Sequence, residues 1–353
     1  MKPMSDTSRI FASLASLALL VGCGIENRHI PSEPVFTRTA DLNDRDAFAW
    51  SEPVWLGPVV NSSARDWKPS LSPHGLSLYF HSNRVEAGGL GGFDIWVSRR
   101  AGPNCPWEAP VDLGPPVNTP LDDGDANFTP DGHVLFFSST GHGGAGAGDI
   151  FMARRAHTNH DFEWGEPVNL GPDVNTALHE SNPEYVAAED GGTLYFDRSV
   201  EGIPSTNDIY RVSLTKDGQT RGPAVLVSEL SAPGIADASA AVRADGRELI
   251  FWSGGAVGSR PGGVGLADLW VSTRQSVNDP WSEPRDVGTP VNSEFAELSA
   301  TLSQDGRTLF FTAAAGRGGL GLQDLWMSTR GPIGDDNDQD VDEGGGDHQT
   351  RCR

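Results

Sequence analysis

The sequence is short of cationic side chains. Lysine and arginine total 26 against 48 aspartates and glutamates, which gives a formal net charge of −22 over 353 residues. A surface of that sign repels nucleic acid and anionic lipid, so we expect no nucleic-acid partner. The partners that this charge favours are cations, neutral glycans and basic protein surfaces.

Long hydrophobic runs are also missing. The apolar run from Ile10 to Val21 is too short for a spanning helix and follows Lys2 and Arg9, which is the layout of a secretory signal peptide. Its end, "LVGC", resembles the bacterial lipobox. That resemblance implies that Cys23 is acylated, that the lipid attaches the protein to a membrane, and, because Gly24 follows rather than Asp, that this is the outer membrane. A plain signal peptide and an uncleaved anchor are the alternatives.

The lipid anchor makes a direct prediction. Replacing Cys23 with serine removes the acylated thiol, so the C23S protein should leave the membrane fraction, as followed by cell fractionation and immunoblotting. An equally membrane-bound C23S protein would refute the anchor.

Few residues have the spacing of a catalytic or metal-binding motif. Cys105 and Cys352 are the only other cysteines and have no metal-ligand spacing; in an oxidising compartment they could pair, and the sequence leaves this open. Neither G-x-S-x-G nor H-E-x-x-H occurs. "HTNHD" (157–161) places two histidines three apart in a predicted loop, which we interpret as a solvated turn.

Glycine and proline are abundant, with 43 and 25 residues, which favours an all-β chain rich in tight turns. One motif that begins with tryptophan occurs four times, and we call it the tryptophan line. Its copies are "WSEPVWLGPVVN", "WEAPVDLGPPVN", "WGEPVNLGPDVN" and "WSEPRDVGTPVN", at 50–61, 107–118, 164–175 and 281–292. A degenerate copy lies near Thr220. Such periodicity is the signature of a repeat architecture.

Two further phrases recur five times between these lines. One is a turn followed by an apolar run, as in "SQDGRTLFF", and the other is a short strand, as in "GGFDIWVS". Glycine supplies the positive φ of the turn, the run after it is typical of a buried strand, and the proline of the tryptophan line suits an edge strand. Each copy therefore predicts a four-stranded antiparallel sheet.

These phrases resemble the WD40-like, TolB-type β-propeller repeat over residues 50–330, with departures at His74 and before Gly191. We predict an all-β fold: a five-bladed β-propeller with four antiparallel strands per blade. The first tryptophan line precedes any inner strand and none follows the last copy, so the N-terminal line should close the ring. The alternatives are a ring completed by a partner and an open array.

The predicted segments are a signal peptide (1–22), a tether (23–48), the propeller (49–331) and an acidic disordered tail (332–353).

One acidic position recurs before each inner strand. The five residues are Asp66, Asp123, Glu180, Asp237 and Glu297. In a closed ring they would lie near one mouth of the channel, where they could hold calcium, or they could be structural carboxylates that accept backbone N–H bonds, which their equivalence favours. We expect no cofactor, with calcium in the channel as the alternative. A second recurring acid, such as Asp94 or Asp324, should fix its loop through side-chain to backbone bonds.

Aromatic residues that break the repeat are candidate contacts for a ligand or partner. Trp67 follows the acid Asp66, where the other copies have small or aliphatic residues, and could stand at the channel mouth. His81 and Trp252 share one equivalent position at the end of the second strand. Ordinary packing is the alternative for all three.

From these features we expect an exported, monomeric, lipid-anchored protein of the cell envelope that serves as a non-enzymatic protein-interaction scaffold. The alternatives are a glycan- or peptidoglycan-fragment-binding propeller and, third, a glycoside hydrolase. A hydrolase needs two carboxylates with different environments. Asp125, Glu184 and Glu294 are extra, unpaired acids outside the repeated set, but no sequence feature brings two of them together. The partner is accordingly expected to be an envelope protein or a glycan.

Overall fold

The computed structural model describes residues 49–331, apart from 86–87, 204–205 and 256–258, and also Cys352. The predicted signal peptide, Cys23, the tether up to residue 48 and almost all of the predicted tail lie outside the described residues. Within the described ranges, no helix has the length and apolar character needed to cross a membrane.

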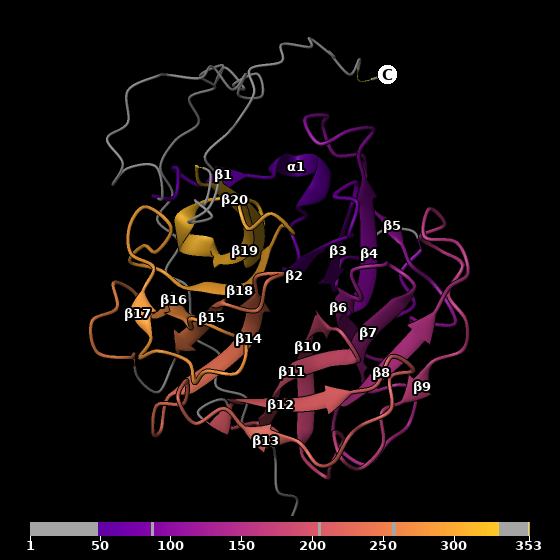
Figure 1. The fold of residues 1–353 in the computed structure, drawn as a ribbon. Helices are drawn as coiled ribbons and strands as arrows, with labels where there is room; N and C mark the ends of the chain where they lie inside the picture. Colours follow the sequence, from indigo (N-terminus) through magenta and orange to yellow (C-terminus); the bar gives the residue numbers. More distant parts are fainter. Residues whose placement is uncertain (1–48, 86–87, 204–205, 256–258, 332–351, 353) are drawn as a thin grey trace, which may run out of the picture. The chain divides into compact units, whose positions relative to one another are not determined.

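Five four-stranded antiparallel sheets form the blades of a ring (Figure 1). Blade 1 holds β2 (Asp66–Leu71), β3 (Ser77–Ser82), β4 (Asp94–Arg99) and β5 (Val111–Asp112). Blade 2 holds β6 (Asp123–Phe128), β7 (Val134–Ser139), β8 (Asp149–Arg154) and β9 (Val168–Asn169). Blade 3 holds β10 (His179–Ala188), β11 (Gly191–Ser199), β12 (Asp208–Leu214) and β13 (Val225–Leu226). Blade 4 holds β14 (Ala236–Val242), β15 (Glu248–Gly254), β16 (Ala267–Thr273) and β17 (Arg285–Asp286).

Blade 5 is assembled from both ends of the described chain. It contains β18 (Glu297–Leu302), β19 (Thr308–Ala314) and β20 (Gln323–Thr329), and its outer strand is β1 (Val54–Trp55). Helical elements with described bounds include α1 (Gly57–Val60) and the 3₁₀ turn η2 (Ala315–Arg317). The predicted five-bladed propeller, closed by the N-terminal strand, is confirmed.

The hydrophobic core lies between neighbouring blades. Five clusters of buried side chains each join two adjacent sheets; the one between blades 5 and 1 contains Leu78, Phe80, Trp96 and Phe310. A single sheet of this size cannot cover both its faces, so each blade depends on its neighbours for burial. The stability of the fold therefore depends on the ring being closed.

The repeated tryptophan line binds the outer part of each blade to its third strand. In blade 1, the amide of Asn118 exchanges two hydrogen bonds of 3.0 Å with the backbone of Ile95. The guanidinium of Arg100 stacks 4.3 Å from the ring of Trp107. Asn175 and Asn292 form the same backbone pairs in blades 2 and 4. The repeated Trp and Asn of the line are thus structural.

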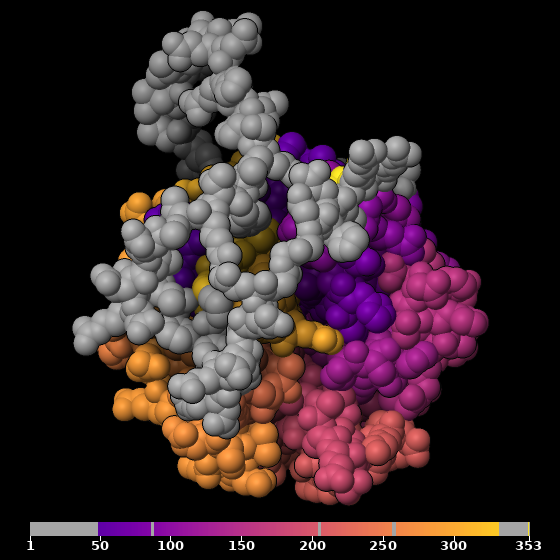
Figure 2. Space-filling model, turned by 45° about the horizontal axis from the view of Figure 1, so that its top comes forward, coloured from indigo at the N-terminus to yellow at the C-terminus, as the bar shows by residue number. Residues whose placement is uncertain are grey.

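Across the closure, the first line forms these same contacts with the last strand. Val54 pairs with Met327, Asn61 exchanges hydrogen bonds of 2.7 and 3.2 Å with the backbone of Leu325, and Arg330 stacks 4.5 Å from Trp50. Figure 2 shows the indigo N-terminal residues beside the yellow last blade. The first strand of the described residues thus supplies the outer strand of blade 5.

A disulfide joins Cys105 to Cys352, with the two Cα atoms 5.6 Å apart. It connects the loop between β4 and β5 to a residue 247 positions later in the sequence. The pairing that the sequence leaves open is therefore formed.

Candidate functional site

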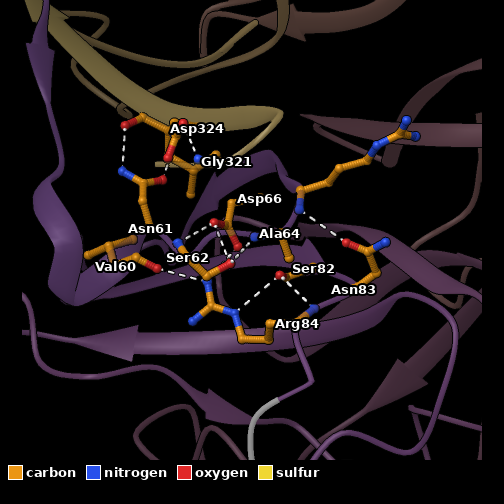
Figure 3. Close-up of polar contacts among 12 residues, drawn as sticks. Val60, Asn61, Ser62, Ala64, Asp66, Ser82, Asn83, Arg84, Gly321 and Asp324 are labelled. Atoms are coloured by element: carbon orange, nitrogen blue, oxygen red, sulfur yellow. Dashed lines mark hydrogen bonds and ion pairs between the residues drawn. The ribbon is translucent and has the colours of Figure 1, made fainter. Parts of the chain in front are cut away.

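The five predicted channel-mouth acids are fully buried, each at the start of an inner strand. Asp66 shows their common arrangement (Figure 3): it accepts a hydrogen bond of 2.6 Å from the backbone nitrogen of Ser62 and pairs with Arg84 at 2.5 Å. The other acids accept a backbone N–H in the same way. Glu180, Asp237 and Glu297 are also paired with an arginine. The four acids with an arginine partner therefore use their oxygens for bonds within the protein, and they stabilise the fold.

Blade 2 breaks this pattern. Asp123 is the one acid of the five for which the described residues supply no arginine partner. His142 takes the arginine's place: its Nε2 lies 2.8 Å from the carbonyl oxygen of Val117, as Arg84 Nη2 lies 2.8 Å from that of Val60. Burial raises the pKa of Asp123. Burial raises the pKa of Asp237 as well, so what distinguishes Asp123 from its four equivalents is the histidine in place of an arginine.

Each inner strand has a bulge two residues after its acid, where a residue other than glycine takes a positive φ. The five residues are Lys68, Asp125, Asn182, Ser239 and Ser299. Such backbone is uncommon outside glycine, although Asp and Asn adopt it more readily than lysine or serine, and it turns the side chains away from the regular alternation of the strand. Their bonds run from blade to blade: Lys68 Nζ donates to Ser239 Oγ at 2.9 Å, and Asn182 N donates to Asp125 Oδ2 at 3.2 Å.

Lys68 and three carboxylates form a buried network in the middle of the ring. Lys68 is about 1% exposed, and its charge acts on Asp125, Glu184 and Asp197, which are also buried. Glu184 accepts from the side chain of Asn127 and from the backbone nitrogen of Val242, so it bridges blades 2 and 4. We call these four residues the channel network.

The environments of the three carboxylates differ. Burial raises the pKa of Glu184 to about 7, only partly offset by the charge of Lys68 and the N–H of Val242. Burial also raises the pKa of Asp197 well above its usual range. Asp125 is equally buried, but contacts with His81 and Ser138 and the charge of Lys68 hold its pKa well below the usual value. Asp125 is therefore the carboxylate that remains ionised.

A pocket of about 190 Å³ opens above Asp125, at the end of the ring where the inner strands begin. Blade 2 supplies most of its lining, blade 1 supplies His81 and Phe93, and blade 3 supplies His179. We call it the mouth pocket; its lining includes His81, Phe93, Asp123, Asp125, Ser138 and His179. It combines carboxylates, hydroxyls and an aromatic ring, and its two buried aspartates have pKa values shifted in opposite directions.

Two glycines make room for the pocket's histidines. A Cβ atom on Gly124 would lie 2.5 Å from Nδ1 of His81, and one on Gly148 would lie 2.6 Å from the ring of His179. Without side chains at these positions, His81 reaches Asp125, with its Nδ1 3.2 Å from the backbone nitrogen and 3.3 Å from Oδ1. Gly124 stands where Trp67 stands in blade 1 and Ala238 in blade 4.

The structure separates the three predicted aromatic contacts. His81 lines the mouth pocket. Trp67 lies beside it, with ring centroids 6.2 Å apart, but points across to blade 5, where Nε1 donates to Ser299 Oγ at 2.6 Å. Trp252 packs against the core between blades 4 and 5. Contact of these residues with a ligand stays a prediction, as does calcium in the channel.

Sequence reasoning missed Lys68, Asp197 and the lining residues Phe93 and His179. It noted Asp125 and Glu184 but could not bring them together; both belong to the channel network, whereas Glu294 is exposed. One signal was present: the residue two places after each acid is polar in all five copies. Because Lys68 and Asp125 each follow a repeated acid by two residues, this spacing would have placed them at equivalent positions around the ring.

Comparison with known proteins identifies solved structures with a similar fold. No family model matches the chain, and no curated protein matches it. Among solved structures, an endo-arabinase from Bacteroides thetaiotaomicron is 18% identical, with a TM-score of 0.52 over 80% of this chain and 99% of that chain. A thermostable family-43 glycoside hydrolase is 14% identical, with a TM-score of 0.53 over 78% and 92%. An α-L-arabinofuranosidase from Lactobacillus brevis is 11% identical, with a TM-score of 0.53 over 78% and 92%.

At these identities the matches establish a shared five-bladed fold. Our expectation of a non-enzymatic interaction scaffold is nevertheless wrong, because the structures just named are glycoside hydrolases. The site also differs from what a scaffold predicts. A scaffold should present a broad, flat surface, whereas the channel mouth holds a pocket with two buried aspartates of opposite pKa shift.

Proposed function

We propose that the protein binds a neutral glycan in the mouth pocket. The observation that carries this proposal is the pocket's lining, where Asp125, Ser138 and two histidines offer hydrogen bonds to hydroxyl groups beside the ring of Phe93. Sites for drug-sized ligands measure about 300–1,000 Å³, so a pocket of about 190 Å³ suits one sugar unit at a chain end or branch. The net charge of −22 disfavours anionic glycans.

Binding should depend on the aromatic ring and on the ionised carboxylate. We expect Phe93→Ala and Asp125→Asn each to weaken binding by about 1–3 kcal/mol, roughly 5- to 150-fold, because each removes a principal contact. Isothermal titration with neutral oligosaccharides, including arabinose-containing chains, measures this. Phe162→Ala and Asp217→Asn, at positions outside the pocket, are the matched controls. Equal affinity in wild type and Phe93→Ala would refute the site.

Hydrolysis of a glycosidic bond is the second candidate, favoured by the opposite pKa shifts of the two pocket aspartates. The pattern is that of an acid and base pair. Asp123 would protonate the leaving oxygen, and ionised Asp125 would take a proton from the attacking water, as in an inverting glycosidase. Release of reducing sugar that falls by about 10²–10⁴ in Asp123→Asn and in Asp125→Asn would support it. Binding without release would leave only the glycan-binding function.

We also propose that the chain belongs to the TolB-type WD40-like repeat group and is anchored in the outer membrane through Cys23. The support is the five repeated phrases and the "LVGC" sequence. An anchored ring would place the mouth pocket in the envelope, where neutral glycans are available.

A further inference from the structure

The loop between β8 and β9 gathers three metal-ligating side chains on the outside of blade 2. His157, His160 and Glu163 each offer one ligand atom, and these atoms lie within 4.8 Å of one another. Nδ1 of His160 is 2.7 Å from Glu163 Oε2, and Nδ1 of His157 is 3.9 Å from the same oxygen. The two imidazole rings are tilted toward each other with centroids 5.2 Å apart.

This loop is fixed to the propeller at a residue between the ligands. The carboxylate of Asp161 is buried and accepts hydrogen bonds from Ser77, Tyr79, Arg99 and Arg155. Trp164, just after Glu163, is buried in the core between blades 1 and 2. The loop backbone is therefore held in place, and its ligands do not have to be gathered when an ion arrives.

The ligand side chains themselves remain free to adjust. His157, His160 and Glu163 are 65%, 44% and 62% exposed. Bonds of about 2.0–2.2 Å from zinc to imidazole nitrogen and carboxylate oxygen place tetrahedral ligands a little over 3 Å apart. The 2.7 Å between His160 and Glu163 must therefore widen and the 3.9 Å between His157 and Glu163 must narrow, changes that rotations of these exposed side chains can supply.

We propose that His157, His160 and Glu163 form a binding site for a divalent transition-metal ion of the zinc class. Two imidazoles and one carboxylate suit zinc in preference to calcium or magnesium, which favour oxygen ligands alone. Three protein ligands leave a coordination position open to water or to a group from another molecule. The site lies in the loop between β8 and β9 and shares no lining residue with the mouth pocket.

The test is metal titration of the untagged, EDTA-treated protein. Cobalt(II) should bind with one ion per chain and show visible absorption bands of a low-coordinate nitrogen and oxygen site, and zinc should displace it. His157→Ala and His160→Ala should each weaken binding at least about tenfold, the loss that even an outer-shell change produces. His74→Ala, at an exposed histidine of blade 1, should bind as wild type does.

Absence of saturable cobalt or zinc binding would overturn the site, as would unchanged affinity in both histidine variants. All three ligands are exposed, so circular dichroism should show that the variants fold as wild type does. The titration involves no sugar, so its failure is distinguishable from failure of glycan binding.

Discussion

Deleting residues 49–61 should open the ring and lower the melting temperature by roughly 10 °C, because blade 5 loses its outer strand and the last intersheet core loses Val60. The deletion also removes both hydrogen bonds between Asn61 and Leu325. The exposed edge of β20 would then be available for pairing with other chains. Differential scanning calorimetry gives the melting temperature, and light scattering gives the aggregation.

Neighbouring valines provide a matched pair for this prediction. Val60 is fully buried and Val59 is about half exposed. Val60→Ala should cost about 2 kcal/mol, the value of two buried methyl groups plus a small cavity. Val59→Ala should change the free energy of unfolding by less than about 0.5 kcal/mol. A deletion protein that melts with wild type would mean that the ring does not depend on its N-terminal strand.

Replacing Lys68 with methionine should destabilise the fold by about 3–5 kcal/mol, because it leaves the buried, ionised carboxylate of Asp125 without the charge of Lys68. Methionine keeps most of the volume, so the loss reports charge more than packing. Lys216 is exposed, and Lys216→Met is the control. Urea denaturation at pH 7 measures both variants. A Lys68→Met protein as stable as the control would mean that the network carries no net charge interaction.

The same network predicts a pH dependence. The pKa of Glu184 is about 7 in the fold against 4.5 as the usual value, so the folded state holds this proton more tightly than the unfolded state does. The resulting stability is fully present below about pH 4.5 and is lost as the pH rises toward 7, a change of about 3 kcal/mol. In Glu184→Gln this part of the pH dependence should disappear, as followed by denaturation at pH 5 and pH 8. A slope unchanged by the substitution would exclude Glu184 as its source.

The sequence predicted the fold well because the repeated residues are the structural ones. Trp50 and Asn61 have equivalents in other blades that make the corresponding contacts, and the equivalents of Asp66 all accept a backbone N–H as it does. Asp94 and Asp324 accept backbone N–H bonds within their own loops, as predicted. Ring closure could also be inferred, because one tryptophan line precedes the first inner strand and none follows the last copy of the repeat.

The site was harder to predict because it lies where the repeat is broken. Lys68, Asp125 and Ser239 occupy equivalent positions but differ in chemistry, so a search for repeated residues passes over them. Their contacts depend on distances between side chains of different blades, and the spacing of residues along the sequence does not give these distances. The pocket depends in addition on an absent side chain at Gly124, whose meaning appears only when His81 is seen lying over it.

The most direct test of glycan binding is a crystal structure of the protein with the oligosaccharide that binds most tightly in titration. The result we predict is one sugar unit in the mouth pocket, against Phe93 and hydrogen-bonded to Asp125. Sugar bound elsewhere on the ring, or no binding by any neutral oligosaccharide tested, would contradict the proposed function.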